Sequence, residues 1–248
     1  MILLRSTVFN LVFYVVLVAY LCATLPAYFM QRRAMIAVAR HWAKTNIVLL
    51  RLICGIKVDF RGLEKIPPGP LICASKHQSL WETFALITLF DDPAYIMKRE
   101  LMWIPFFGWA TWKAGMIAVD RGARGAALEA MNERAKTEIR KGRQLIIFPE
   151  GTRRAPGAEP KYKFGVAHLY SEIGAPCLPV ALNSGLFWPR RSFMRYPGTI
   201  RVVMCDPIQP GMDKQAFLAQ VQSEIEAATA GLIEQGRAEL QAAGIEPP

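Results

Sequence analysis

Three short polar stretches of this chain carry side chains that can do acid–base or anion-binding chemistry. "KHQSLWE" places a histidine five residues before a glutamate, "DRG" holds an arginine, and "PEGTRR" packs a carboxylate, a glycine, a hydroxyl and a guanidinium into five residues. The residues concerned are His77, Glu82, Asp120, Arg121, Glu150, Gly151, Thr152 and Arg153.

Each polar stretch follows an apolar run typical of a buried strand: "PLICAS", "AGMIAVD" and "RQLIIF". In open α/β sheets, ligands bind outside the carboxyl ends of the strands. We therefore expect the three stretches to converge at one edge of a sheet, although they are far apart in the sequence.

Arg121 and Arg153 are the candidate anion-binding residues. A single arginine in such a loop is more often a solvated charge, and Glu150 has the alternative of merely pairing with Arg153. Two arginines at neighbouring strand ends favour a phosphate site, because guanidinium matches phosphate with two parallel hydrogen bonds. Together with the Gly–Thr turn, they indicate a polyol phosphate as ligand.

His77 and Glu82 allow two interpretations. By residue type alone, His77 is as consistent with a loop or core residue as with a general base. Ser79 and Glu82 fit the capping box S-x-x-E, which predicts a helix that starts at Ser79. Five helical residues rotate by about 140°, so His77 and Glu82 share no helix face. If His77 precedes the helix, a Glu82 side chain that reaches back to the cap also points toward the imidazole, and both roles are compatible.

The chain lacks the signature motifs of several other enzyme classes. The chain has no G-x-S-x-G, no G-x-x-x-x-G-K-[ST] and no H-E-x-x-H, which argues against a serine hydrolase, a P-loop nucleotide hydrolase and a zinc protease. Its five cysteines are scattered without a C-x-x-C pair, so we expect reduced core residues and no metal site. A nucleic-acid-binding motif is also missing, so the net charge of +10 does not indicate nucleic acid.

The amino-terminal residues indicate a membrane. Residues 7–30 contain no charge and are long enough to cross a hydrocarbon core of about 30 Å. A signal peptide is disfavoured by the length of the run and by a flank with only Arg5. The basic residues that follow predict that the remainder lies in the cytoplasm. Pro26 leaves the alternative that the segment bends and dips into one leaflet.

Residues 32–54 alternate apolar clusters with Arg40, Lys44 and Arg51, which suits an amphipathic helix at the membrane interface. The alternative is an ordinary helix packed on the rest of the protein. His41 beside Trp42 is interpreted as interfacial. Basic residues dominate 31–65, and such a band beside an apolar segment attracts anionic headgroups.

From residue 56 onward, short apolar runs alternate with helical patterns. This order predicts one α/β domain over 56–248, with a mostly parallel sheet of about seven strands flanked by helices, preceded by a membrane-anchoring segment over 1–55. Strands are expected at "IKVDF", "PLICAS", "AYIMK", "AGMIAVD", "RQLIIF", "CLPVAL" and "TIRVVMC", and helices at 80–90, 124–141, from about 164, and at 213–241.

The three polar stretches together resemble the glycerolipid acyltransferase family, and within it the bacterial 1-acyl-sn-glycerol-3-phosphate acyltransferases. The family's H-x-x-x-x-D motif corresponds to "HQSLWE", and its further motifs to "GMIAVDR", "FPEGTRR" and "APCLPVAL". The resemblance covers about residues 57–210. "FPEGTR" is highly specific, whereas "GMIAVDR" and "APCLPVAL" are weak alone. Glu82 stands where the family has aspartate, which keeps the acid but moves it one methylene outward.

The resemblance implies acyl transfer from acyl-CoA or acyl-carrier protein to the 2-hydroxyl of lysophosphatidic acid, without an acyl-enzyme and without a cofactor. His77 would be the general base and Glu82 its orienting acid. Arg121 and Arg153, with Lys163 in "YKFGVA", would bind the phosphate, and Glu150, Gly151 and Thr152 the glycerol part. The enzyme would work on phospholipids at the inner face of the cytoplasmic membrane.

Two competing functions remain. A relative in the same family could use another acceptor, such as a lyso-ornithine lipid or another lysophospholipid. From a different class, the chain could be a non-catalytic lipid-binding membrane protein, against which a retained histidine base argues.

Overall fold

The computed structural model describes residues 1–120 and 124–246, and within them a seven-stranded sheet forms the centre of the molecule. The strand order is β1-β7-β6-β2-β5-β3-β4. The strands are β1 (Ile56–Arg61), β2 (Leu71–Ser75), β3 (Pro93–Lys98), β4 (Ile117–Val119), β5 (Gln144–Ile147), β6 (Cys177–Leu182) and β7 (Gly198–Met204).

Only the β6–β7 pair is antiparallel among the described strand pairs. Strands β2 to β6 therefore all point one way, and their carboxyl ends meet at one edge of the sheet. We call this edge the active edge. Residues in β2, β5 and β6 are almost all buried because both faces of the sheet are covered.

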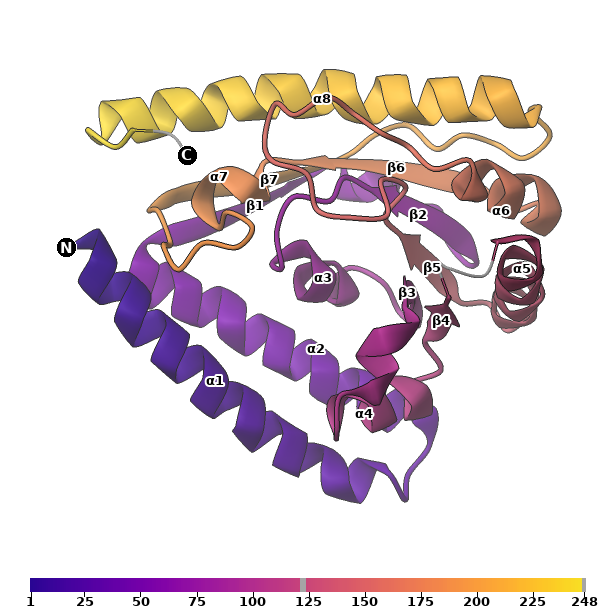
Figure 1. The fold of residues 1–248 in the computed structure, drawn as a ribbon, viewed down its shortest axis with the longest axis horizontal. Helices are drawn as coiled ribbons and strands as arrows, with labels where there is room; N and C mark the ends of the chain where they lie inside the picture. Colours follow the sequence, from indigo (N-terminus) through magenta and orange to yellow (C-terminus); the bar gives the residue numbers. More distant parts are fainter. Residues whose placement is uncertain (121–123, 247–248) are drawn as a thin grey trace.

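Helices cover the two faces of the sheet (Figure 1). The hairpin α1–α2, α3 and α4 lie on one face, and the long α8 lies on the other, where it packs with α6, which in turn contacts α5. The helices are α1 (Ile2–Ala27), α2 (Arg32–Leu49), α3 (Glu82–Ala85), α4 (Phe107–Lys113), α5 (Arg124–Arg140), α6 (Gly165–Ile173), α7 (Ser184–Phe187) and α8 (Lys214–Ala242).

The predicted fold class is confirmed: one mostly parallel sheet flanked by helices, with the strands and α5, α6 and α8 close to their expected positions. One helix is shorter than predicted. Residues 80–90 form only α3 and a following 3-10 turn, Leu86–Thr88. Seven of the eleven side chains in this segment are buried, so it lacks the broad polar face of a regular amphipathic helix.

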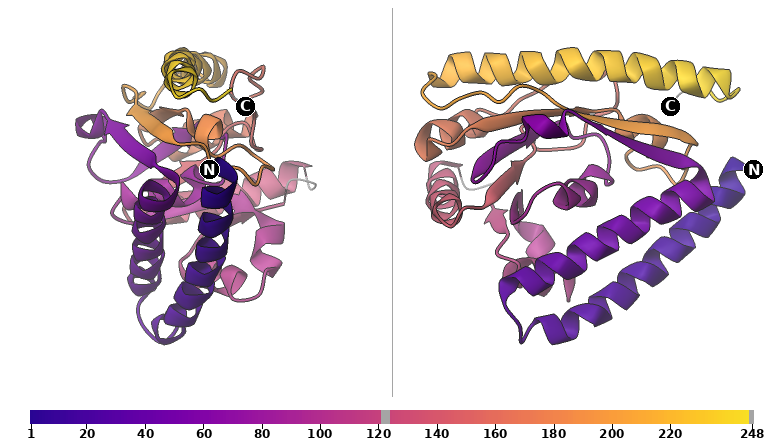
Figure 2. Two further views of the ribbon diagram at one scale, coloured as in Figure 1. Left: turned by 90° about the vertical axis from the view of Figure 1, so that its left-hand side faces the viewer. Right: turned by 180° about the vertical axis from the view of Figure 1, so that it is seen from behind.

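The amino-terminal apolar run forms α1, the one described helix that is long and apolar enough to cross a membrane. It turns at residues 28–31 and pairs with α2, which ends in a π-helical turn at Leu50–Cys54 (Figures 1 and 2). Phe9 and Phe13 of α1 share a buried cluster with Trp188 and with apolar residues of the sheet. Both helices therefore pack on the α/β domain.

The start of α1 is fastened to the loop before β7. The Ser6 hydroxyl accepts a hydrogen bond from the Arg195 amide at 2.9 Å, and the Asn10 side chain bonds both the Arg195 guanidinium and the Phe193 carbonyl. The Arg195 guanidinium also lies over the Trp188 ring, 4.2 Å from its centroid. Burial lowers the pKa of Arg195 to about 10.

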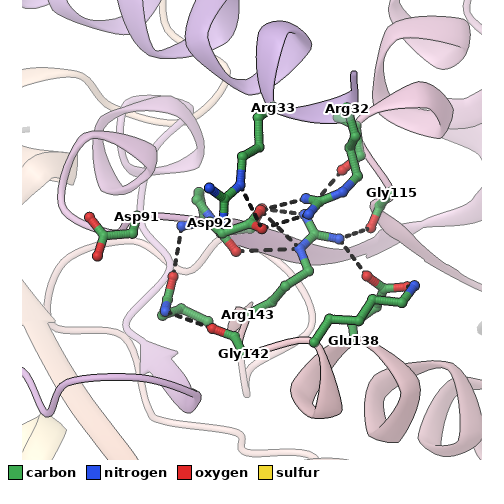
Figure 3. A network of polar contacts seen from close by, with 12 residues as sticks. Arg32, Arg33, Asp91, Asp92, Gly115, Glu138, Gly142 and Arg143 are labelled. Atoms are coloured by element: carbon green, nitrogen blue, oxygen red, sulfur yellow. Dashed lines mark hydrogen bonds and ion pairs between the residues drawn. The ribbon is translucent and has the colours of Figure 1, made fainter. Parts of the chain in front are cut away.

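The other end of the hairpin is fastened by a buried charge network (Figure 3). Arg32, at the start of α2, forms two hydrogen bonds with the Asp92 carboxylate, and Asp92 also accepts one from Arg143 at 3.1 Å. Arg143 is fully buried and bonds Glu138 at 2.8 Å. Burial alone raises the pKa of Asp92, but the hydrogen bond from Arg32 and the charges of Arg143 and Arg32 outweigh it, so the pKa is lowered.

Candidate active site

His77 lies two residues after the end of β2, at the active edge. Its ring stacks on Phe148, which follows β5, with centroids 4.0 Å apart and an interplanar angle of 17°. The Arg154 amide donates to the His77 carbonyl at 2.8 Å. The backbone and the ring of this histidine are thus both held by the segment that follows β5.

Glu82 is fully buried and points back at the imidazole. Its Oε1 lies 2.9 Å from His77 Nδ1 and also accepts hydrogen bonds from the amides of Gln78 and Ser79, at 2.7 and 2.6 Å. Its Oε2 accepts one from the Ser184 hydroxyl at 2.7 Å. An ionised carboxylate only accepts, so Nδ1 carries the proton and Nε2 keeps its lone pair. This tautomer is the one a general base needs.

Glu82 also fulfils one half of the capping box. It accepts from the Ser79 amide, while the Ser79 hydroxyl accepts from the Trp81 amide at 3.2 Å. Helix α3 begins at Glu82 itself and not at Ser79, because residues 79–81 form the turn that brings the carboxylate back to His77. Glu82 can therefore bond the Ser79 amide as a capping residue and the His77 ring at the same time.

Glu150 is buried and both of its oxygens are occupied. Its Oε2 accepts from the His77 amide at 3.1 Å, and its Oε1 lies 3.0 Å from Lys76 Nζ. Lys76 is buried as well and forms a second ion pair of 2.6 Å with Glu226 of α8, which also accepts from the Tyr162 hydroxyl. Burial raises the pKa of Glu150, against the opposing effect of Lys76.

The other predicted residues of "PEGTRR" line the same edge. Gly151 has φ +67°, a conformation that favours glycine, and the Lys163 side chain packs 3.5 Å from where its Cβ would lie. Thr152 is exposed and Arg153 is half-buried. The Lys163 amide bonds the Pro149 carbonyl at 2.9 Å, which brings this lysine beside the loop. Arg121 lies outside the described residues. Its neighbour Asp120 pairs with Arg99 at 3.2 Å.

The structure therefore brings His77, Glu82 and Glu150 into one bonded cluster, with Gly151, Thr152, Arg153 and Lys163 on the adjoining loop. Sequence reasoning missed Lys76, Ser184, Tyr162 and Glu226. A signal existed only for Lys76, because a lysine that directly follows a strand expected to be buried needs a buried counter-charge.

Comparisons with known proteins point to one protein family. The model of the acyltransferase family matches residues 57–183. The 1-acyl-sn-glycerol-3-phosphate acyltransferase of Pseudomonas aeruginosa is 38% identical over 190 residues, which cover 77% of this chain and 74% of the relative. The mouse 1-acyl-sn-glycerol-3-phosphate acyltransferase alpha is 32% identical over 66% of this chain and 61% of its own length.

The crystal structure of the 1-acyl-sn-glycerophosphate acyltransferase PlsC from Thermotoga maritima superposes with a TM-score of 0.77. The alignment covers 94% of this chain and 98% of the PlsC chain, and at 22% identity it shows a shared fold. The family match spans more than half of the chain and contains the His77–Glu82 pair and the loop after β5. The chain belongs to the acyltransferase family.

Proposed function

We propose that the protein transfers an acyl group from a thioester, acyl-CoA or acyl-carrier protein, to the 2-hydroxyl of 1-acyl-glycerol-3-phosphate, giving phosphatidic acid for phospholipid synthesis. The observation that carries the proposal is the His77 imidazole, whose Nδ1 is bonded to a buried carboxylate at the carboxyl end of β2. The names of the two curated relatives support the acceptor.

In this mechanism His77 Nε2 takes the proton of the 2-hydroxyl as its oxygen attacks the thioester carbonyl. Glu82 stabilises the resulting imidazolium through Nδ1. The tetrahedral intermediate then expels the thiolate of the donor, which takes the proton from Nε2. The new ester and a free thiol are the products, no acyl-enzyme forms, and the reaction needs no metal or further cofactor.

The acceptor's phosphate is proposed to bind Arg153 and Lys163, with Arg121 as a further candidate. Gly151 and Thr152 would then lie against the glycerol, because a glycine lets the substrate approach the backbone closely. Glu150 is buried, and its two oxygens already bond the His77 amide and Lys76 Nζ. We therefore propose that Glu150 holds the His77 backbone in place.

The protein is proposed to work at the inner face of the cytoplasmic membrane, with α1 lying in one leaflet. Both ends of α1 bond the same α/β domain, at Arg195 near its start and, through Tyr28, at Phe106 just past its end. A spanning helix would separate these ends by a hydrocarbon core of about 30 Å. The fastened geometry instead favours a hairpin whose apolar outer face dips into the bilayer.

The decisive assay follows thiol release from acyl-CoA and acyl-carrier protein by the purified protein with lysophosphatidate. We expect turnover that depends on lysophosphatidate, with at least tenfold preference over a lyso-ornithine lipid of the same chain length. Equal or greater turnover with the lyso-aminolipid would reassign the acceptor. Lipid binding without thiol release from any donor would favour a non-catalytic protein.

A further inference from the structure

The segment after β3 exposes an unusual amount of apolar surface. Residues 101–112, "LMWIPFFGWATW", contain no charge, and Trp103 and Trp112 are 70% and 72% exposed. Patches of this kind on a monomer mark contacts with a partner or a membrane. The exposed apolar side chains are Leu101, Trp103, Ile104, Phe106, Trp109 and Trp112, and we call them the aromatic patch.

The aromatic patch is held in place by the backbone. Gly108 packs so closely on the preceding turn that a Cβ there would lie 1.9 Å from the Met102 carbonyl oxygen, and its amide bonds the Ile104 carbonyl at 2.7 Å. Phe106 has φ +62°, which is uncommon for a residue with a side chain and is retained where surrounding contacts impose it. The aromatic rings are therefore presented outward by a fixed backbone.

The patch continues the apolar outer surface of the hairpin. The hydroxyl of Tyr28, the first residue of the α1–α2 turn, donates to the Phe106 carbonyl at 3.2 Å. In the turn itself, Phe29 is 94% exposed and Met30 is also exposed. Figures 1 and 2 show α4 beside this turn, on the same side of the sheet as α1 and α2 and opposite α8.

From this continuity we propose that residues 101–112 are a second membrane-binding element, which inserts its tryptophans into the interfacial region of the leaflet that receives α1. Tryptophan is enriched at that depth because its ring is apolar and its N–H is polar. After the patch, Lys113 is a basic side chain suited to anionic headgroups, and before it Lys98 and Arg99 pair with Glu100 and Asp120. The proposal rests on the proposed membrane function of the hairpin.

This element would also orient the active edge. Arg99 directly follows the carboxyl end of β3, which is at the same edge as His77. A patch anchored in the interface would hold that edge next to the headgroup region, where a lysolipid presents its hydroxyl. The hairpin and the aromatic patch would attach the protein to the membrane at two places. Two attachments restrict the tilt of the protein relative to the membrane more than one does.

Tryptophan quenching tests insertion directly. The wild type and the triple variant Trp103→Phe, Trp109→Phe, Trp112→Phe are bound to phosphatidylcholine–phosphatidylglycerol vesicles with brominated acyl chains. Phenylalanine keeps the surface apolar, so both proteins stay bound, and the difference in emission reports the three exposed tryptophans. We expect this difference emission to be quenched by the brominated lipid and shielded from aqueous iodide. The proposal would be overturned if iodide quenched this difference emission in the vesicle-bound protein. It would also be overturned if the three tryptophans were shielded from iodide without vesicles, through self-association of the protein.

A matched pair of variants tests the functional consequence. Ile104 and Leu63 are both 46% exposed, but Leu63 lies outside the aromatic patch. It is part of the short 3-10 turn Leu63–Lys65, whose Lys65 pairs with Asp206. With lysophosphatidate in vesicles, we expect Ile104→Asp to raise the apparent KM about tenfold. An isoleucine side chain buried in the membrane would strengthen binding of the protein to the vesicle by a factor of that order. Leu63→Asp should leave it unchanged. Equal KM values for the two variants would contradict the proposal.

A short-chain lysophosphatidate below its micelle concentration separates this proposal from the proposed function. Ile104→Asp should turn over the dissolved acceptor at the wild-type rate. A wild type that acylates neither form of the acceptor would refute the proposed acyl transfer, whatever the quenching experiment shows.

Discussion

At the scale of single residues, the site depends on how Glu82 is held. Its carboxylate is fully buried and accepts hydrogen bonds from two amides, a hydroxyl and the His77 ring. Every one of these partners donates, so both oxygens of the buried carboxylate are satisfied. The turn at residues 79–81 brings this carboxylate back to the His77 ring.

The role of Glu82 is tested by comparing two substitutions in the same turn. We expect Glu82→Gln to lower kcat by about 10²- to 10⁴-fold, because an amide can donate to Nδ1 and select the wrong imidazole tautomer. Ser79→Ala, the matched control, removes one capping bond and should cost about 1 kcal/mol of stability while turnover is largely kept. Similar losses of kcat in both variants would reduce Glu82 to a capping residue.

Lys76 has a different, structural prediction. Lys76→Met leaves the Glu150 carboxylate buried without its cation, and we expect a loss of about 3–5 kcal/mol in the free energy of unfolding. Lys65→Met is the control, because Lys65 pairs with Asp206 at the surface, where water and salt screen the interaction and its loss should hardly change the stability. Chemical denaturation in detergent micelles measures both. An equally small loss for Lys76→Met would show that Glu150 is not kept ionised by this lysine.

The sequence predicted the local contacts of the site but not its long-range contacts. The His77–Glu82 contact could be anticipated because five residues and one turn define it. Ser184 is 102 residues from Glu82, and Glu226 is 150 from Lys76, so only the folded sheet and α8 bring these pairs together. Nothing local in the sequence marks such partners.

At the scale of elements, the Asp92 network fastens the hairpin turn to the sheet. Because the pKa of Asp92 lies below its ordinary value of 3.8, its ionised form stabilises the fold fully above that pH. This contribution is lost as the pH falls below 3.8 through the lowered pKa. Glu138, whose pKa is also lowered, acts in the same direction.

We therefore expect Asp92→Asn to be destabilised by about 3–5 kcal/mol at neutral pH, because Arg143 stays buried with one counter-charge fewer. The loss of stability as the pH falls below 3.8 should also be smaller than in the wild type. Thermal unfolding followed by circular dichroism in micelles gives both quantities. Asp59→Asn, which breaks an exposed pair with Arg61, is the control. An acid profile unchanged by Asp92→Asn would contradict this role.

Elements were predicted well where the apolar pattern is long and less well elsewhere. The parallel strands are continuous apolar runs, which is why six residues such as "CLPVAL" suffice to place β6. The reversed direction of β7 has no such signature, because a strand reads alike in either orientation. The patch at 101–112 escaped notice because exposed tryptophans resemble core residues in a sequence.

At the scale of the whole molecule, the placement of α1 distinguishes an in-plane hairpin from a spanning helix. We expect Arg5→Cys and Gln31→Cys, each in a Cys22→Ser background, to react with an impermeant maleimide from the cytoplasmic face only. Both positions are exposed, and among the described native cysteines only Cys22 is exposed. Labelling of the two positions from opposite faces of the membrane would establish a spanning helix.

The central claim is that His77 is the base of an acyl transfer. The most direct test is the initial rate of acylation of lysophosphatidate by His77→Ala, with circular dichroism as the check that the fold is intact. The account predicts a fall of at least about 100-fold, the usual contribution of a general base. Turnover near that of the wild type in a folded His77→Ala protein would contradict it.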